Sequence, residues 1–269
     1  MKAPRAAAPS VSRIGLAEVM AFGAGDMGFN IIWGLMLSYL AYFYTEISLL
    51  PVQMVGFMLM AARAASLVTD PVVGLWIDHR PAGRQAIPVL RGGIAPFMVL
   101  VALTFMPLPH AWPVGMRGLC AAMGYMALCV AYGVVNTAYG AMTSLISPDH
   151  DMRLRLATSR MVGATLGSLL VSITTLPMVD WLGHGDRQAG FALYMVVVAC
   201  VVGGLLWLPS RFCHERVATD GGDMTARARV AGLLANRGWR RLTGAMLLTM
   251  LGSTCLLYTS PSPRDRSVS

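Results

Sequence analysis

Three side chains that can ionise or donate a hydrogen bond lie inside one long apolar stretch of this sequence. Arg63, Ser66 and Asp70 fall at positions i, i+3 and i+7, a spacing that puts them on one face of a helix. A charged side chain in such a segment costs a few kcal/mol on insertion scales and usually has a function. Pro71 removes a helical hydrogen-bond donor and so frees backbone carbonyls beside the Asp70 carboxylate. The set suits a cation or a proton, and the alternative is a buried acid that pairs with a neighbouring helix for assembly alone.

Polar side chains follow a helical spacing in two other apolar stretches. Asp26 and Asn30 stand one turn apart, and the alternative to a solute contact for Asn30 is an interhelical hydrogen bond. A second stripe has its members at i, i+4, i+7 and i+11: Tyr132, Asn136, Tyr139 and Thr143. Arg160 lies near the start of a further apolar run, where it either faces a cavity or extends to the membrane interface.

The composition places these residues in a membrane protein. Hydrophobic residues make up 56% of the 269 residues and charged residues 13%, which is about half the charge of a soluble domain. The apolar runs are long enough to cross a bilayer, which takes about 20 residues. The net charge of +8 lies mainly in short loops, so it orients the chain and gives no reason to expect a nucleic-acid partner. The spacing of the histidines and cysteines predicts neither a metal site nor a disulfide framework.

Six membrane-spanning helices are predicted, followed by the start of a seventh. The six spans cover residues 14–44, 51–77, 86–106, 113–146, 156–182 and 191–208. We expect residues 1–208 to form a six-helix bundle, 209–238 a polar loop, and 239–254 the beginning of a further helix, because the last apolar run is too short to cross. The arginine-rich loops fall on one side, so the positive-inside rule places the N-terminus and the 209–238 loop in the cytoplasm.

Residues 255–269 depart abruptly from the membrane pattern. They begin with the letters CLLYTSPSPRD, which resemble the translation of a transposase sequencing adaptor. We therefore expect this tail to be an artefact without defined structure, and the gene to continue past Thr254.

The letters GLWIDHRPAGR, residues 74–84, resemble the signature of the major facilitator superfamily in the loop between its second and third helices. That signature has a glycine, three apolar positions, an acid, basic residues and then Gly-Arg. The resemblance implies that Asp78, Arg80 and Arg84 form a gating latch at one face of a transporter, where the acid pairs with arginines and caps helix ends.

A closer resemblance is to the glycoside–pentoside–hexuronide:cation symporters, the branch that includes the melibiose carriers. It covers about residues 14–239 and is carried by the segments at 23–46, 62–78, 136–144, 148–160, 214–216 and 236–239. It implies an all-α membrane protein with the major facilitator fold, in which this chain holds the N-terminal bundle of two inverted three-helix repeats and the start of a second half.

The family's cation site carries over unevenly to this chain. Asp70 matches the second acid of that site, and Arg63 lies on the same helix face. Ser66 replaces the first acid, and Thr69 replaces the amide that precedes the second one. Gly133 stands where the family has a hydroxyl ligand. Sodium takes several oxygen ligands together with charge compensation, but a proton needs only one carboxylate. We therefore expect proton coupling, or no coupling, in preference to sodium, and we expect no other cofactor.

The family's solute positions correspond to Asn30, Asn136 and Arg160, with Asp26 and Tyr139 beside them. In melibiose-type carriers the first two positions are often acids, which accept hydrogen bonds from sugar hydroxyls. Asparagine both donates and accepts, so the resemblance implies a different or an anionic sugar here. Arg160 would suit a carboxylate or a sulfonate.

The predicted function is a secondary active transporter of the bacterial inner membrane, a solute:cation symporter for a sugar, a glycoside or a sugar acid. Its partners would be the solute, the lipid bilayer and the missing C-terminal half. One alternative keeps the fold and carries a lysolipid or another amphiphile, as some relatives in the resembling family do. A non-transporting membrane sensor or scaffold is the alternative of another class. An enzyme is not expected, because no His/Glu/Asp cluster or Ser–His arrangement falls inside the spans.

Overall fold

The computed structural model describes residues 15–259 apart from 82–83, 110, 218–230 and 233–234, and this part of the chain is helical without any strand. The chain divides into two compact units, residues 1–220 and 221–269. Six long helices belong to the first unit, and each is apolar enough to cross a membrane. They are α1 (Leu16–Tyr42), α2 (Val52–Asp78), α3 (Ile87–Thr104), α4 (Val114–Ile146), α5 (His150–Gly183) and α6 (Arg187–Phe212). A π-helical turn, η1 (Phe43–Ile47), extends α1. The prediction of an all-α, multi-pass membrane protein is confirmed.

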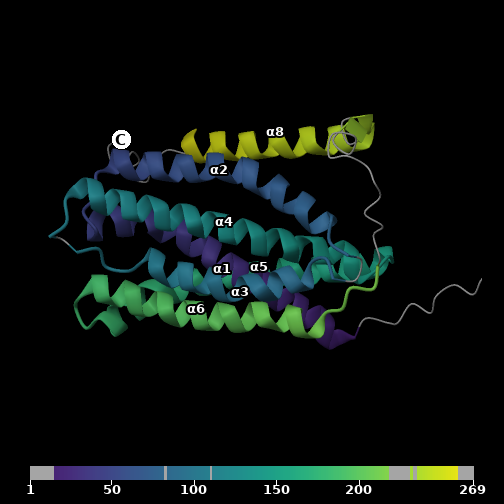
Figure 1. Ribbon diagram of the computed structural model, residues 1–269, viewed down its shortest axis with the longest axis horizontal. Helices are drawn as coiled ribbons and strands as arrows, with labels where there is room; N and C mark the ends of the chain where they lie inside the picture. The colour runs from purple at the N-terminus through teal and green to yellow at the C-terminus, as the bar shows by residue number, and fades with distance from the viewer. Residues whose placement is uncertain (1–14, 82–83, 110, 218–230, 233–234, 260–269) are drawn as a thin grey trace, which may run out of the picture. The chain divides into compact units, whose positions relative to one another are not determined.

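The helices of the first unit lie alongside one another, and their contacts follow an internal repeat (Figure 1). α1 packs against α5 and α6, whereas α4 packs against α2 and α3. Exchanging α1, α2 and α3 with α4, α5 and α6 converts one set of contacts into the other, and the α3–α6 pair maps onto itself. The packing of α5 against α6 is an exception, because α2 and α3 do not pack against each other in the same way. Because each repeat contains three spans, the second repeat enters the membrane from the opposite side, which is the inverted arrangement expected of this fold.

Several helices extend beyond the spans predicted from hydropathy, because polar residues precede their first turns. α5 begins at His150 rather than near residue 156, directly after Asp149 as its N-cap residue. α6 begins at Arg187, where the Asp186 carboxylate accepts hydrogen bonds from the backbone N–H groups of residues 188 and 189. The same helix continues to Phe212, so the bundle does not end at residue 208.

Glycines bring α1 and α5 into close contact. A Cβ atom at Gly23 would lie 2.7 Å from the Ser159 carbonyl oxygen, and one at Gly167 would lie 2.6 Å from that of Met27. A Cβ atom at Gly163 would overlap the Gly23 carbonyl oxygen. Only glycine leaves room for this approach, and small residues commonly allow it between membrane helices.

The second unit contains the helix α8 (Arg237–Thr259). Its N-terminus is capped by Asn236, whose Oδ1 accepts hydrogen bonds from the backbone N–H groups of Gly238 at 2.9 Å and Trp239 at 3.2 Å. The helix continues through Thr259, so the prediction that the chain lacks defined structure from residue 255 onward is wrong for residues 255–259. Residues 260–269 lie outside the described part of the chain.

Candidate functional site

A cavity of about 390 Å³ opens in the first unit between α1, α2 and α4. Its polar and aromatic lining comes from one face of each helix: Asn30 and Trp33 of α1, Arg63, Ser66 and Asp70 of α2, and Tyr125, Cys129, Tyr132 and Asn136 of α4. The three polar residues of α2 share one face, as their spacing predicted, and that face forms a wall of the cavity.

The Asp70 carboxylate approaches α4 at Gly133. A Cβ atom at position 133 would collide with Asp70 Oδ1, so a glycine here lets the carboxylate lie against the α4 backbone. Within the described residues no ion pair joins Asp70 to an arginine. The alternative that this acid serves only to tie two helices together therefore has no such pair to support it.

The two hydroxyl groups predicted beside Asp70 do not converge on it. Ser66 lines the cavity, but its Oγ donates a hydrogen bond of 3.1 Å to the Ala62 carbonyl oxygen of its own helix. Thr69 does not line the cavity, and its Oγ1 is buried without a hydrogen-bond partner in the described part of the chain. The expected contribution of Thr69 to a cation site is not seen, because its side chain points elsewhere.

Arg63 is held by an aromatic ring of α1. Its guanidinium carbon lies 4.3 Å from the centroid of the Trp33 ring, which is a cation–π contact. Trp33 lies beside Tyr132 of α4, with their ring centroids 5.9 Å apart. Tyr132 in turn meets Phe29 edge to face at 5.7 Å. These rings fix the part of the cavity wall on which Arg63 rests.

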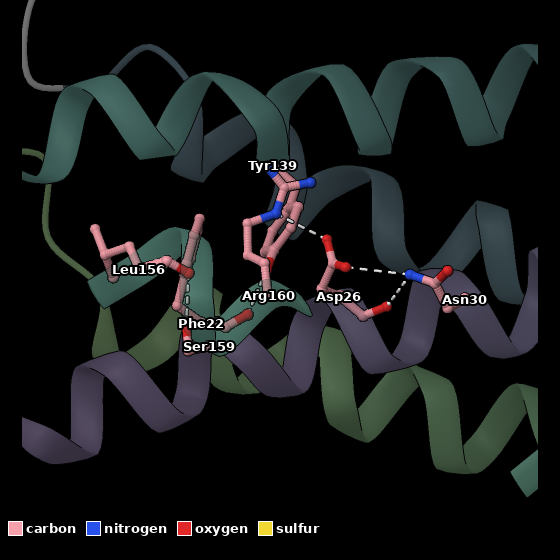
Figure 2. Close-up of polar contacts among 7 residues, drawn as sticks. All are labelled: Phe22, Asp26, Asn30, Tyr139, Leu156, Ser159 and Arg160. Carbon is pink, nitrogen blue, oxygen red and sulfur yellow. Dashed lines mark hydrogen bonds and ion pairs between the residues drawn. The ribbon is translucent and has the colours of Figure 1, made fainter. Parts of the chain in front are cut away.

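Arg160 forms an ion pair instead of facing the cavity (Figure 2). Its Nε donates to Asp26 Oδ1 at 2.8 Å. Asn30 Nδ2 donates to the second oxygen of Asp26 at 3.1 Å and to the Asp26 backbone carbonyl at 2.9 Å. Arg160 is therefore not among the residues that line this cavity, and its extension to the membrane interface stays a prediction. The hydrogen bond of Asn30 lies within α1 rather than between helices. Asp26 links Arg160 to Asn30, and of these three only Asn30 reaches the cavity.

Tyr139 does not line the cavity, contrary to its predicted place among the solute contacts. Its side chain is fully buried, and its hydroxyl donates a hydrogen bond to the Phe22 carbonyl oxygen. The ring stacks on Phe22 with centroids 4.7 Å apart and also faces the Arg160 guanidinium carbon at 5.2 Å. Tyr139 therefore joins α4 to α1 and supports the ion pair, as Figure 2 shows.

The predicted polar stripe of α4 accordingly divides into two parts. Tyr132 and Asn136 reach the cavity, whereas Tyr139 and the hydroxyl of Thr143 are buried. No hydrogen bond occupies the Asn136 amide among the described residues. Asn30 and Asn136 thus present two amides to one cavity from two different helices.

The predicted latch lies at the C-terminal end of α2. Asp78 is the last residue of that helix. The Arg80 guanidinium carbon lies 4.7 Å from the Trp76 ring centroid. The Arg84 backbone N–H donates to the Pro81 carbonyl oxygen at 3.1 Å. Residues 82–83, between the two arginines, lie outside the described part of the chain, and the pairing of these three residues stays a prediction.

A set of contacts that sequence reasoning missed follows α6. The Glu215 carboxylate accepts three backbone hydrogen bonds at the start of α3. They come from Gln85 at 2.8 Å, Ala86 at 2.8 Å and Ile87 at 2.7 Å. Those N–H groups have no partner inside their own helix, so Glu215 caps α3 from a segment far along the chain.

The residues next to Glu215 fasten the same segment to two more helices. Arg216 donates to both carboxylate oxygens of the buried Glu18 of α1, at 2.7 and 2.9 Å. Its backbone N–H donates to the Leu145 carbonyl oxygen of α4 at 2.9 Å.

Burial raises the pKa of the Cys213 thiol to about 12. We call residues 213–217 the brace. Residues 214–216 are among the segments that carry the family resemblance. That resemblance is the sequence signal that could have indicated the brace.

The sequence matches the family described as MFS/sugar transport protein over residues 21–260. It is 31% identical over 232 residues to the putative glycoside/cation symporter YagG of Escherichia coli K12, covering 86% of this chain and 50% of the relative. The inner membrane symporter YicJ of the same organism is 28% identical over 246 residues, with 90% and 52% covered. A putative sulfoquinovose importer, also of E. coli K12, is 26% identical over 230 residues, with 84% and 47% covered. The chain spans about half the length of these curated relatives.

Proposed function

The chain belongs to the MFS/sugar transport protein family, and we propose that it forms the first half of a solute:cation symporter for a sugar, a glycoside or a sugar acid. The family and the relatives named above are transporters, which confirms the expectation that the chain is not an enzyme. The proposal places the protein in a bacterial inner membrane with its N-terminus in the cytoplasm, as the loop charges predict. The observation that carries it is the cavity, where two amides and one carboxylate meet.

The solute part of the proposal rests on Asn30 and Asn136. Asn136 offers two donors and an acceptor, and Asn30, whose Nδ2 donates to Asp26, offers its Oδ1 as an acceptor; together they match the hydroxyl groups of a sugar. Asn30 is held in place by Asp26, so its orientation is set before a solute binds. The cavity volume of about 390 Å³ falls in the range of roughly 300–1,000 Å³ usual for small-molecule sites. Apolar side chains such as Met36 and Leu128 share the wall with these amides, which suits a sugar because its hydroxyl groups alternate with apolar ring faces.

The coupling part of the proposal rests on Asp70. It lines the same cavity as the two amides. Ser66 also lines it, but Thr69 does not, so the carboxylate and one hydroxyl oxygen are fewer ligands than sodium takes. One carboxylate can carry a proton without other ligands. Proton binding at Asp70 and solute binding would then affect each other equally, because a coupling free energy between two sites is reciprocal.

Flux measurements on the complete carrier test the proposal. The measurements use a carrier of the length of the relatives, about half of which this chain spans. The carrier is then reconstituted into proteoliposomes with an imposed proton or sodium gradient, and the uptake of labelled sugars and sugar acids is followed. We expect accumulation with the proton gradient and little response to sodium.

Two variants separate coupling from assembly. Asp70→Asn should abolish uphill accumulation and keep downhill exchange, whereas the matched control Asp180→Asn, at an exposed ion pair near the end of α5, should behave as the wild type. Ser66→Asp restores the paired acids of the family and is expected to add sodium dependence. If the Asp70→Asn protein still concentrates solute, the coupling proposal is wrong. If the wild type moves no solute at all, the sensor or scaffold alternative is favoured instead.

A further inference from the structure

Arg63 carries hydrogen-bond donors that nothing in the described part of the chain uses. Its guanidinium faces the ring of Trp33 at 4.3 Å and lines the cavity. A cation–π contact occupies the flat face of the guanidinium and leaves the N–H groups at its edge available. Those edge donors form a rigid fork that matches two oxygens of a carboxylate or a sulfonate. The structure therefore presents a positioned anion receptor in the cavity wall.

Arg160, the arginine that the family resemblance assigns to an anionic group, already has its charge paired. Its Nε donates to Asp26 at 2.8 Å (Figure 2). The side chain of that acid is only 11% exposed. Its guanidinium also rests on Tyr139. Asp26 therefore already compensates the charge of Arg160, whereas no carboxylate pairs with Arg63 among the described residues, so a solute anion gains more from Arg63.

The charges around the cavity point to the same residue. Arg63 and Asp70 are the charged side chains among its described lining residues. In the proposed symport cycle Asp70 binds a proton and becomes neutral, so the closed cavity would keep the positive charge of Arg63 alone. An anionic group on the solute would compensate that charge, whereas a neutral sugar would leave it without a partner in the cavity.

We propose that Arg63, positioned by Trp33, binds a carboxylate or sulfonate group of the solute, while Asn30 and Asn136 bind the hydroxyl groups of the same molecule. The solute of this carrier is then an anionic sugar, and the residue that selects it is Arg63 rather than Arg160. This inference rests on the proposed function and deepens it. Trp33 acts as a positioning residue, because it holds the receptor without contacting the anion itself.

Binding of charged and neutral sugars to the purified complete carrier tests the inference. The probes are D-glucuronate against D-glucose, and D-galacturonate against D-galactose, measured by titration calorimetry. The wild type should bind a uronate about tenfold or more tightly than its neutral counterpart. Arg63→Gln should lose about tenfold to a hundredfold in uronate affinity, the range for a charge-assisted bidentate hydrogen bond, and leave neutral sugars unchanged. Arg63→Lys should retain part of the preference, because lysine keeps the charge but not the fork.

Three further variants distinguish selection from support. Trp33→Leu should reduce the preference for the uronate, because the guanidinium is no longer held in place. Arg160→Gln should weaken both members of each pair alike, since it releases Asp26 and through it Asn30. Arg211→Gln, at an exposed arginine near the end of α6, is the matched control and should change nothing. Cys129 lies in the cavity wall, and a bound sugar should protect it against an alkylating reagent. This protection reports whether the site is occupied in each variant.

The outcomes separate this inference from the proposed function. The inference is overturned if Arg63→Gln loses affinity for uronates and neutral sugars equally. It is also overturned if Arg160→Gln loses affinity for uronates alone. Wild-type carrier that binds neutral sugars as tightly as uronates also overturns it and leaves the proposed function standing. Wild-type carrier that binds neither kind of sugar refutes the proposed function, and the inference fails with it. Should Arg63→Gln not fold, the Arg63→Lys and Trp33→Leu proteins supply the same comparison.

Discussion

Replacing Glu215 with alanine should destabilise the six-helix unit, although this residue lies outside every membrane-spanning helix. The substitution removes the acceptor of three backbone N–H groups, those of residues 85, 86 and 87, at distances of 2.7–2.8 Å. It also removes a negative charge from the N-terminal end of α3, where the helix dipole favours one. The brace would then hold α1 and α4 but no longer α3.

The size of the effect depends on whether water can replace the carboxylate. Three charge-assisted hydrogen bonds lost in a dry interior would cost several kcal/mol. Glu215 is only half-buried, however, so water reaches the freed N–H groups and the cost of losing a helix cap applies. That cost is about 0.5–2 kcal/mol for the cap and about 0.3–1 kcal/mol for the dipole, or roughly 1–3 kcal/mol together. A change of this size lowers Tm by roughly 2–12 °C in a unit of this length.

Thermal unfolding in detergent, followed by far-ultraviolet circular dichroism, measures the shift. Glu215→Gln should fall between the wild type and Glu215→Ala, because the glutamine carbonyl oxygen can still accept from Ala86 and Ile87 while its NH₂ group faces the Gln85 donor. Glu46→Ala is the matched control, since Glu46 is exposed in η1 and forms no polar contact within the described residues. If Glu215→Ala unfolds at the same temperature as Glu46→Ala, the brace does not stabilise the bundle and the reasoning is refuted.

Three more outcomes follow from the close contacts of the structure. Gly163→Ala should lower the free energy of unfolding by about 1–3 kcal/mol, because the added Cβ would overlap the Gly23 carbonyl oxygen. A variant that unfolds at the same denaturant concentration as the wild type would contradict the close α1–α5 contact. Gly133→Ala should impair proton-driven accumulation more than it lowers Tm, since it displaces the Asp70 carboxylate; unchanged accumulation in proteoliposomes would argue against that contact. Burial raises the pKa of Cys213 to about 12, so at pH 7–8 little of it is thiolate and it should react slowly with maleimide. The measurement is mass spectrometry on a variant that keeps only this cysteine, and rapid labelling would show that the brace is open.

Hydropathy and polar spacing in the sequence determined the architecture. Long apolar runs predicted six spans because only a helix satisfies its own backbone hydrogen bonds in a bilayer, and the described part of the chain contains six helices long and apolar enough to cross one. The helix ends were predicted less accurately, because α5 and α6 both begin in polar residues that hydropathy does not count as part of a span. At α6 the Asp186 side chain caps the first turn. The shared face of Arg63, Ser66 and Asp70 was also predictable, because neighbours along a helix follow from its period alone.

Partners on different helices were decided by the tertiary structure. The i+4 spacing placed Asn30 beside Asp26, but nothing local indicates that Asp26 binds Arg160, 134 residues away in sequence. Equally, the stripe on α4 could not show that Asn136 would face a cavity while Tyr139 would be buried against α1.

The physical reason is that helix period fixes direction only relative to the same helix. Which face meets a neighbour depends on how closely two backbones approach, and here glycines such as Gly23 and Gly163 set that distance for α1 and α5. Charge pairing then follows from the approach, because an arginine in an apolar bundle binds whichever carboxylate comes within reach. The sequence thus determined which polar residues the membrane must accommodate, and only the packed bundle decided that Arg160 would be neutralised and that Arg63 would face the cavity.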